Sequence, residues 1–228
     1  MNDTTTEVAK TGQAFRHCAD IVRLQDKDRF LSSLFAPSEQ RLFLFALYAF
    51  DIETARVRDL VSDPMAGNIR LQWWHEAMAG LRSGEAEAHP VLTALTYTLD
   101  AAASGDRSLV AQAVEARQAE LYGEPAVGAA SAIFKLASRF LAPAKDVPES
   151  MIDDAGRAEL FSRNPIDPQK ASEAYESLRG HLKMLPVAAR PAFLHLALVP
   201  LRLRQPDAPQ WRRQLGLMRA AWFGYPKI

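Results

Sequence analysis

The chain has 228 residues, of which 48% are hydrophobic and 24% are charged, and its formal net charge is zero. This profile is typical of one ordinary globular domain that is large enough to bury a sizeable core. Because a polyanion exerts no net pull on a neutral chain, we expect no nucleic-acid partner, and we expect a membrane contact only through a local patch.

The N-terminal residues 1–14 contain no apolar segment and carry acidic residues, so we expect a flexible tail and neither a secretory signal nor a transit peptide. The longest apolar run, Leu42–Phe50, is about half the roughly 20 residues that a membrane-spanning helix needs. The single cysteine, Cys18, excludes a disulfide framework and favours a cytoplasmic location.

Apolar residues recur three and four positions apart between prolines and glycines, and β-branched alternation never persists. The sequence therefore predicts an all-α fold. The expected helices are Phe15–Arg23, one from Asp26 that ends before Pro37, Ser38–Val61 with Ser38 as N-cap, 68–84 closed by Gly84, 89–103 with Pro90 in its first turn, 107–123 capped by Asp106, Ala126–Leu141, Glu149–Phe161, Pro168–Leu185, Pro191–Leu203 and Gln210–Trp222. Because the linkers are short, residues 15–228 are expected to form a single domain.

The segment LFLFALYAF, residues 42–50, is apolar on all sides, so we expect it at the centre of the bundle. Helical spacing of large side chains is explained by burial alone, and we interpret Tyr48, Phe50, Trp73 and Trp74 as core residues, although the same residues would line an apolar cavity. The histidines are scattered along the chain and form no zinc constellation.

The stretch RFLSSLFAPSEQRLFLFALYAFDIETARVRDLVSDPMAGNIRLQWWHEAMAG resembles the squalene/phytoene synthase family. The similar features are the aromatic-leucine-serine start, the proline before the long helix, ALYAF ahead of the first aspartate motif, and the arginine–tryptophan helix. The resemblance implies an isoprenoid synthase-type helical bundle, truncated here, and head-to-head joining of two allylic diphosphates bridged by Mg²⁺ to facing carboxylates. The substrate contacts that it implies are Arg29, Ser32, Tyr48, Arg70 and Trp74.

The first aspartate motif departs from the family pattern. Active members follow YAF with a D-D-x-x-D run, whereas the matching positions in this chain are Ala55, Arg56 and Asp59. Asp51 and Asp59 flank Ala55 at four-residue steps on one helical face, so a weakened Mg²⁺ site remains an alternative. We expect Arg56 and Arg58 to compete for these carboxylates as ion-pair partners.

The second aspartate motif of active members has no counterpart between Leu121 and Pro168. The acidic pair in that segment is Asp153–Asp154, with Arg157 where a further carboxylate would be needed. These two aspartates are the candidate second half of a metal site, but we interpret them as part of a solvated helix face.

Three other acidic positions bear on the site. Asp28 stands where the family has a phosphate-contacting serine, and a carboxylate there would repel a diphosphate by about 4 kcal/mol at 4 Å and an effective dielectric near 20. Glu120 is interpreted as a surface charge. Glu159 lies one step out of phase with the acidic pair.

Three functional hypotheses follow. The first is a non-catalytic relative that acts as a scaffold and binds a protein partner or an isoprenoid lipid, similar to the mitochondrial complex I assembly factors, in which the family resemblance persists with eroded aspartates. The second is a Mg²⁺-dependent prenyltransferase of squalene- or phytoene-type biosynthesis. The third is an interaction module with a filled centre and no pocket.

The C-terminal segment alternates basic and apolar side chains. Its arginines are Arg202, Arg204, Arg212, Arg213 and Arg219, interleaved with Leu, Trp and Phe. One interpretation is a helix that closes the bundle, and the other is a patch that contacts an anionic bilayer, peripheral to the inner membrane, or an acidic partner.

Overall fold

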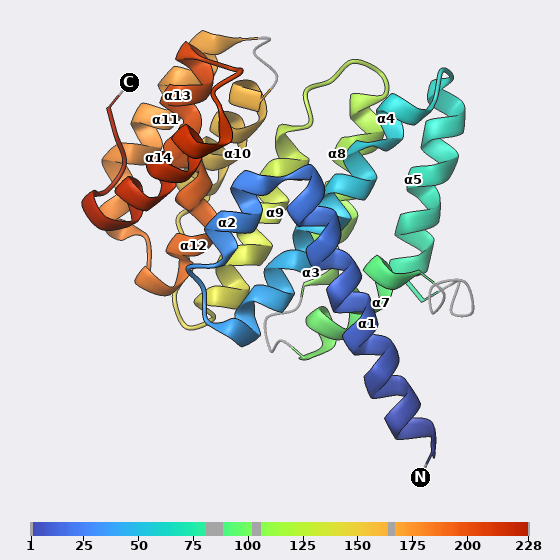
Figure 1. Cartoon of the computed structure of the whole chain (residues 1–228). Coiled ribbons are helices and arrows are strands. Elements are labelled where there is room, and N and C mark those ends of the chain that lie inside the picture. Colours follow the sequence, from blue (N-terminus) through green and yellow to red (C-terminus); the bar gives the residue numbers. More distant parts are fainter. Residues whose placement is uncertain (1, 81–88, 102–105, 164–166, 228) are drawn as a thin grey trace.

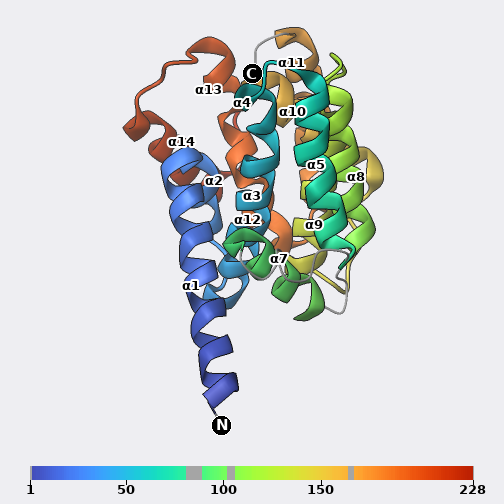
Figure 2. The same ribbon diagram turned by 90° about the vertical axis from the view of Figure 1, so that its right-hand side faces the viewer.

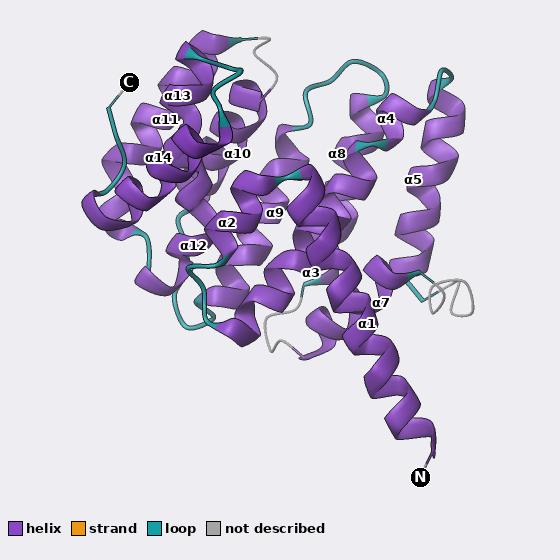
Figure 3. Cartoon of the chain, viewed as in Figure 1, coloured by secondary structure: helices purple, strands orange, loops and turns teal. Residues whose placement is uncertain are grey.

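The computed structural model describes residues 2–80, 89–101, 106–163 and 167–227, and all regular structure in these ranges is helical (Figure 3), so the all-α prediction is confirmed. The α-helices are α1 (Asn2–Gln25), α2 (Lys27–Ser33), α3 (Ser38–Ala55), α4 (Val57–Leu60), α5 (Pro64–Met78), α7 (Pro90–Ala101), α8 (Arg107–Glu120), α9 (Val127–Leu141), α10 (Glu149–Arg163), α11 (Pro168–His181), α12 (Arg190–Phe193), α13 (Val199–Arg204) and α14 (Gln210–Phe223). Short 3₁₀ helices η1 (Leu182–Met184), η2 (Val187–Ala189) and η3 (Leu194–Leu198) connect the last of them.

The helices form a bundle around α3, which packs against α1, α7 and α9 (Figure 1). Helix α9 packs in turn against α8 and α10, and α11 covers α10. Seen from the side, α5 lies along α8 (Figure 2). In both views the first turns of α1 project beyond the bundle. This arrangement is that of an isoprenoid synthase-type bundle.

The centre of the bundle is formed by the last seven of the nine residues of the predicted apolar run. Residues 44–50 are at most 6% exposed, which confirms their central position, whereas Leu42 is 40% exposed at the start of the run. The ring of Phe50 meets Trp74 edge-on at 5.4 Å, and Tyr48 is 1% exposed. Each large side chain buried in this way contributes about 1.5–3 kcal/mol.

Two predicted boundaries at the N-terminal end differ from the structure. Helix α1 begins at Asn2 and not at Phe15, so the helix extends through the expected tail, whose flexibility stays a prediction. The predicted helix Ser38–Val61 is interrupted at Arg56. The hydroxyl of Thr54 donates to the carbonyl oxygens of Phe50 (2.9 Å) and Asp51 (3.2 Å), and such back-bonding bends helices.

Proline and glycine chemistry explains two further boundaries. Helix α5 begins at Pro64, before the expected residue 68, because Asp63 accepts a hydrogen bond from the Met65 amide as its N-cap. The helix is followed by Gly80 with φ +78°, the left-handed conformation that favours glycine at a C-terminus. The predicted closing residue, Gly84, lies outside the described residues.

The predicted helix Pro191–Leu203 is instead divided into α12, η3 and α13. Pro200 supplies no backbone N–H, so a continuous helix through it would lose a hydrogen bond, and the chain restarts as α13 with this proline in its first turn. The predicted helix Pro168–Leu185 similarly leaves the α-helical form at His181 and continues as η1.

Candidate functional site

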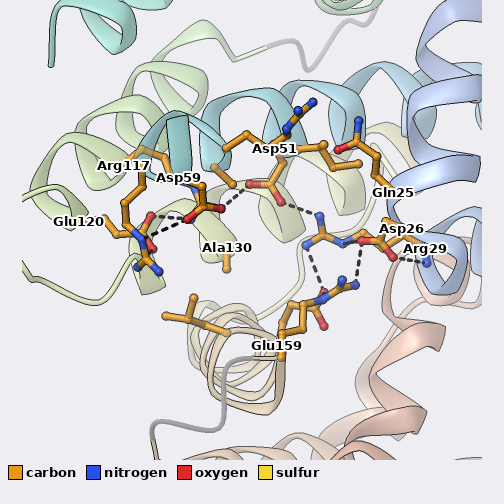
Figure 4. Close-up of a pocket in the computed structure, with 15 residues that line it drawn as sticks. Gln25, Asp26, Arg29, Asp51, Asp59, Arg117, Glu120, Ala130 and Glu159 are labelled. Atoms are coloured by element: carbon orange, nitrogen blue, oxygen red, sulfur yellow. Dashed lines mark hydrogen bonds and ion pairs between the residues drawn. The ribbon is translucent and has the colours of Figure 1, made fainter. Parts of the chain in front are cut away.

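The candidate site is a cavity of about 240 Å³ with walls from α3, α4, α8 and α10 and the start of α2 (Figure 4). Its wall contains equal numbers of cationic and anionic side chains: Arg29, Arg56, Arg58, Arg117 and Arg163, and Asp26, Asp51, Asp59, Glu120 and Glu159. The wall is therefore formally neutral, so its chemistry depends on which charges are already paired.

Asp51 of α3 is held between two guanidinium groups. Nη1 of Arg29 donates to its Oδ2 at 2.5 Å, and Nη2 of Arg117 donates to its Oδ1 at 2.8 Å. All three side chains are at most 10% exposed. Burial alone would raise the pKa of Asp51, but the charges of Arg117 and Arg29 outweigh it and hold this pKa below its ordinary value. Both carboxylate oxygens are thus occupied.

Glu159 of α10 is the most heavily engaged carboxylate. It accepts hydrogen bonds from Arg163 Nε at 2.5 Å and Arg202 Nη1 at 2.9 Å, and Arg29 Nη2 lies 3.3 Å away. Burial opposes its ionisation, yet the surrounding cations hold its pKa well below the ordinary value. Arg29 contacts both Asp51 and Glu159, so it links the two halves of the cavity wall.

The outer part of the wall is more open. Glu120 accepts from Arg117 at 2.9 Å and from Arg58 at 3.1 Å. The side chain of Asp59 is 75% exposed, and its nearest cationic atom, Nε of Arg58, is 3.9 Å away. Arg56 is exposed and forms no ion pair with any residue that the structure describes.

The family implies Mg²⁺ at this place, and the residues present do not fit it. Mg²⁺ requires several oxygen ligands in near-octahedral geometry, but in the described ranges no three His, Cys, Asp or Glu side chains are arranged to hold a metal ion. Every carboxylate of the wall faces a guanidinium, including Asp26, which is 2.8 Å from Arg163. At the motif positions, Ala55 offers a methyl group and Arg56 a competing cation.

A family model described as squalene/phytoene synthase matches residues 22–142, which is more than half of the chain. The chain belongs to the squalene/phytoene synthase family. The match includes both arginines that hold Asp51, whereas Glu159 and Arg163 lie beyond it. The wall of the cavity that α10 contributes therefore lies outside the segment that this model matches.

Curated proteins similar to this chain include complex I assembly factors. NADH dehydrogenase (ubiquinone) complex I, assembly factor 6 from Bos taurus is 36% identical over 76 residues, which is 33% of this chain and 23% of that protein. The Homo sapiens protein of the same name is 35% identical over 75 residues, covering 33% of this chain and 22% of that protein. The Drosophila melanogaster homolog is 31% identical over 99 residues, covering 41% and 30%. Each match thus spans less than a third of the relative's length.

The structure brings together some of the residues that the sequence singled out. Arg29, Asp51 and Asp59 line the cavity, and Arg58 pairs with Asp59 as expected. The expected pairing of Arg56 is wrong for the described part of the chain, in which this exposed side chain forms no ion pair. Assignment of substrate or metal contacts to these side chains stays a prediction.

The other predicted substrate contacts do not line this cavity. The hydroxyl of Ser32 donates to the carbonyl oxygen of Pro191 at 2.6 Å, in the packing of α2 against α12. Tyr48 and Trp74 are packed in the core, and Arg70 is exposed on α5. The core interpretation is confirmed for Tyr48, Phe50 and Trp74, whereas Trp73 is partly buried and packs against the core.

The acidic pair of α10 also lies outside the cavity lining. Asp154 is 6% exposed and accepts hydrogen bonds from Arg157 and from the Ser177 hydroxyl of α11, both at 2.5 Å. The interpretation as a solvated face is therefore wrong for Asp154, because α11 packs across it. Asp153 is only partly exposed and does not line the cavity opposite Asp59.

Two interpretations of acidic residues need correction. Asp28 is buried outside the cavity lining, and its Oδ2 accepts from Arg202 at 3.2 Å and Arg213 at 3.0 Å. Glu120 was expected at the surface, but its side chain is 10% exposed in the cavity wall. Glu159 lines the cavity and faces Arg29 whereas Asp153 and Asp154 do not line it, in agreement with its position out of phase with that pair.

Sequence reasoning missed the cations that neutralise the site. Arg117 and Glu120 are three residues apart, and Glu159 and Arg163 are four apart, so each pair shares a helix face and was detectable as an ion pair. Their convergence on Asp51 and Arg29 was not detectable, because it depends on how α8 and α10 pack around α3.

Proposed function

We propose that this family member is a non-catalytic, assembly-factor-like protein that acts by binding a protein partner. The observation that supports it most strongly is that four carboxylates of the cavity wall, Asp26, Asp51, Glu120 and Glu159, are each paired with an arginine of the same chain, and that only the exposed Asp59 is loosely held. Departure of a diphosphate from an allylic substrate requires bound cations that stabilise the leaving group. In this cavity four of the five carboxylates that would bind such cations are already neutralised.

The energetics point the same way. Freeing Asp51 or Glu159 for a metal ion requires breaking buried ion pairs, and a buried charge left without its partner costs about 3–5 kcal/mol. A hydrated Mg²⁺ ion must also enter against the exposed guanidinium groups of Arg56 and Arg58. The network is therefore better suited to holding α2, α3, α8 and α10 together than to binding substrate.

The partner class is inferred from the relatives, whose names assign them to the assembly of NADH dehydrogenase (ubiquinone) complex I. We propose that this chain binds a subunit or an assembly intermediate of a comparable respiratory complex. A protein partner is preferred over an isoprenoid lipid because Tyr48 and Phe50, two of the residues that would line an apolar cavity, are at most 1% exposed.

The enzymatic reading is tested with purified protein. We expect no pyrophosphate release above the protein-free blank when the chain is incubated with Mg²⁺ and farnesyl or geranylgeranyl diphosphate. Release that is abolished by Asp59→Ala would contradict the proposal. This variant is suitable because Asp59 is largely exposed and its removal leaves the buried network intact.

The assembly role is tested by deletion of the gene from its own genome. We expect less assembled NADH dehydrogenase on native gels, with other respiratory complexes unchanged, and we expect Asp59→Ala to restore it as well as the unaltered chain. Normal assembly together with loss of an isoprenoid product would contradict the proposal. So would a well-expressed Asp59→Ala variant that fails to restore assembly.

A further inference from the structure

Helix α14 carries an apolar stripe on its exposed side. Trp211, Leu215, Met218 and Trp222 follow one another at steps of four, three and four residues, so they lie on one face of the helix. They are 58%, 62%, 57% and 79% exposed, respectively. The opposite face, which includes the buried Leu217, packs against η3. The helix thus closes the bundle with one face and leaves a second apolar face uncovered.

The position of α14 makes this stripe accessible. The helix lies at the front of the molecule in Figure 1 and at its left edge in Figure 2, so it is on the periphery of the bundle. Phe223, at its end, is 83% exposed. Large aromatic and aliphatic side chains grouped on one exposed helix face mark an interaction surface and not scattered surface residues.

Two grooves border the stripe, and cations line both. Trp222 borders a groove of about 420 Å³ that contains Lys183 and Arg190. Trp211 and Leu215 border a groove of about 670 Å³ on the other side. The cations in this second groove are Arg204, Arg212, Arg219 and Lys227. Neither groove is lined by an acidic residue.

The charge of this region contrasts with that of the whole chain. Residues 177–228 contain nine Lys and Arg residues and one acidic residue, Asp207, in a chain whose net charge is zero. Arg202 and Arg213 form ion pairs with Asp28 and are therefore not available to a ligand. The cations that line the two grooves form no ion pair within the described part of the chain.

We infer that α14 and its two grooves form a docking surface for an anionic lipid bilayer, a property beyond the proposed partner binding. An interfacial helix places Trp and Leu side chains at the boundary between headgroups and acyl chains, while flanking Lys and Arg contact lipid phosphates. Exposed tryptophans at both ends of the stripe, cations beside it and the lack of acidic residues meet these requirements. In the described ranges no helix is long and apolar enough to span a bilayer, so the contact is peripheral.

The test is sedimentation of the full chain with vesicles. We expect strong binding when phosphatidylcholine vesicles contain about one third phosphatidylglycerol, little binding to pure phosphatidylcholine, and weakening by salt. Leu215→Gln with Trp222→Gln is expected to lower the partition coefficient at least about tenfold, as is Arg212→Glu with Arg219→Glu. Circular dichroism melting checks that each variant is folded, and these side chains are exposed enough for substitution.

Matched controls lie on α5. Met65 and Ile69 are 68% and 67% exposed, so Met65→Gln with Ile69→Gln removes comparable apolar surface elsewhere, and Arg70→Glu reverses an exposed charge. Neither control is expected to change binding. The inference would be overturned by absence of binding to anionic vesicles or by an equal loss of binding in the controls. It would also be overturned by a dimer in light scattering that becomes monomeric in the α14 variants. The last result would assign the stripe to a second copy of the chain.

Discussion

The guanidinium of Arg29 lies 2.5 Å from the carboxylate of Asp51, and the two side chains are 5% and 8% exposed. Arg29 also lies 3.3 Å from Glu159, and its guanidinium stacks 4.9 Å from the ring of Tyr48. One side chain of α2 therefore connects α3 and α10 at the place where the family resemblance predicts bound metal. Arg29 is therefore a structural junction between these helices.

Loss of this junction is expected to destabilise the fold. In Arg29→Met, Glu159 keeps two cations but Asp51 keeps only Arg117. We expect the free energy of unfolding, measured in urea, to fall by about 3–5 kcal/mol, because a buried carboxylate loses a partner. Arg29→Met combined with Asp51→Leu is expected to recover part of this loss, since both charges are then removed.

The matched control for this prediction is an exposed ion pair. Arg23 lies 2.9 Å from Asp20 on α1, and both side chains are 59% exposed. Arg23→Met is expected to change the free energy of unfolding by less than about 1 kcal/mol. A similar small effect for Arg29→Met would show that the network around Asp51 contributes little to stability.

Most of the fold was predictable because helix signals are local. The caps at Asp106 and the proline at Pro90 begin helices where expected, since a carboxylate that accepts an amide hydrogen and a residue without an N–H act on adjacent backbone. The break at Arg56 was missed because the Thr54 hydroxyl, two residues earlier, bonds to backbone oxygens of its own helix, a contact that can bend a helix. The pattern of apolar residues does not report that contact.

The missing metal ligands of the site were predictable from the sequence, but the ion pairs between helices that surround Asp51 were not. Ala55 and Arg56 stand at two positions where the family pattern has aspartate, so the loss of two ligands can be read from the sequence. The pairing of Arg117 with Asp51 and of Glu159 with Arg29 could not be predicted, because the partners are distant in sequence and meet only through helix packing. An ion pair between separate helices carries no spacing rule, unlike a pair at i and i+4.

Restoring the carboxylates should restore cation binding. Ala55→Asp with Arg56→Asp places two oxygen donors beside Asp59 and Glu120 and removes an exposed cation. We expect the melting temperature of this variant to rise with MgCl₂, and a ligand at ten times its dissociation constant stabilises by about 1.4 kcal/mol. The unaltered chain is expected to show no rise.

Arg56→Gln and Ala55→Asn are the controls, because they change size and charge without adding carboxylates. Isothermal titration calorimetry with MgCl₂ distinguishes site binding from general screening, which NaCl at equal ionic strength reproduces. Mg²⁺-dependent stabilisation of the unaltered chain would contradict the proposal that this protein is non-catalytic and binds no metal in the cavity.

The stability of the protein is expected to decrease as the pH falls below about 6.5, partly through His195. This side chain is 0% exposed, and burial holds its pKa below the ordinary value of 6.5. The carboxylate of Glu159, 3.5 Å away, favours protonation, whereas the charges of Arg29 and Arg163 oppose it. Below about pH 6.5 this histidine is therefore protonated in the unfolded chain but stays neutral in the folded chain. Unfolding thus becomes more favourable on acidification.

The variant His195→Phe tests this origin. It keeps an aromatic ring beside Phe134, whose ring stacks 5.6 Å from the imidazole. We expect the difference in melting temperature between the unaltered chain and the variant to shift in the variant's favour between pH 7.5 and 5.5. His89, whose pKa burial also lowers, is present in both proteins and cancels in the comparison. A constant difference across this range would exclude His195 as the titrating group.

The contact between α9 and α10 depends on Gly156. A Cβ atom at this position would lie 2.5 Å from the Ser131 hydroxyl and 2.9 Å from the Ser131 amide nitrogen, so backbone would have to move. Gly156→Ala is expected to destabilise the fold by about 1–3 kcal/mol in urea unfolding, because overpacking displaces α10 and the Glu159 and Arg163 side chains that it carries. Gly12→Ala in α1 meets nothing within 4 Å, so it should instead stabilise by up to about 1 kcal/mol through helix propensity. If both substitutions stabilised the protein equally, the close approach of α9 and α10 would not be a constraint on the position of Glu159.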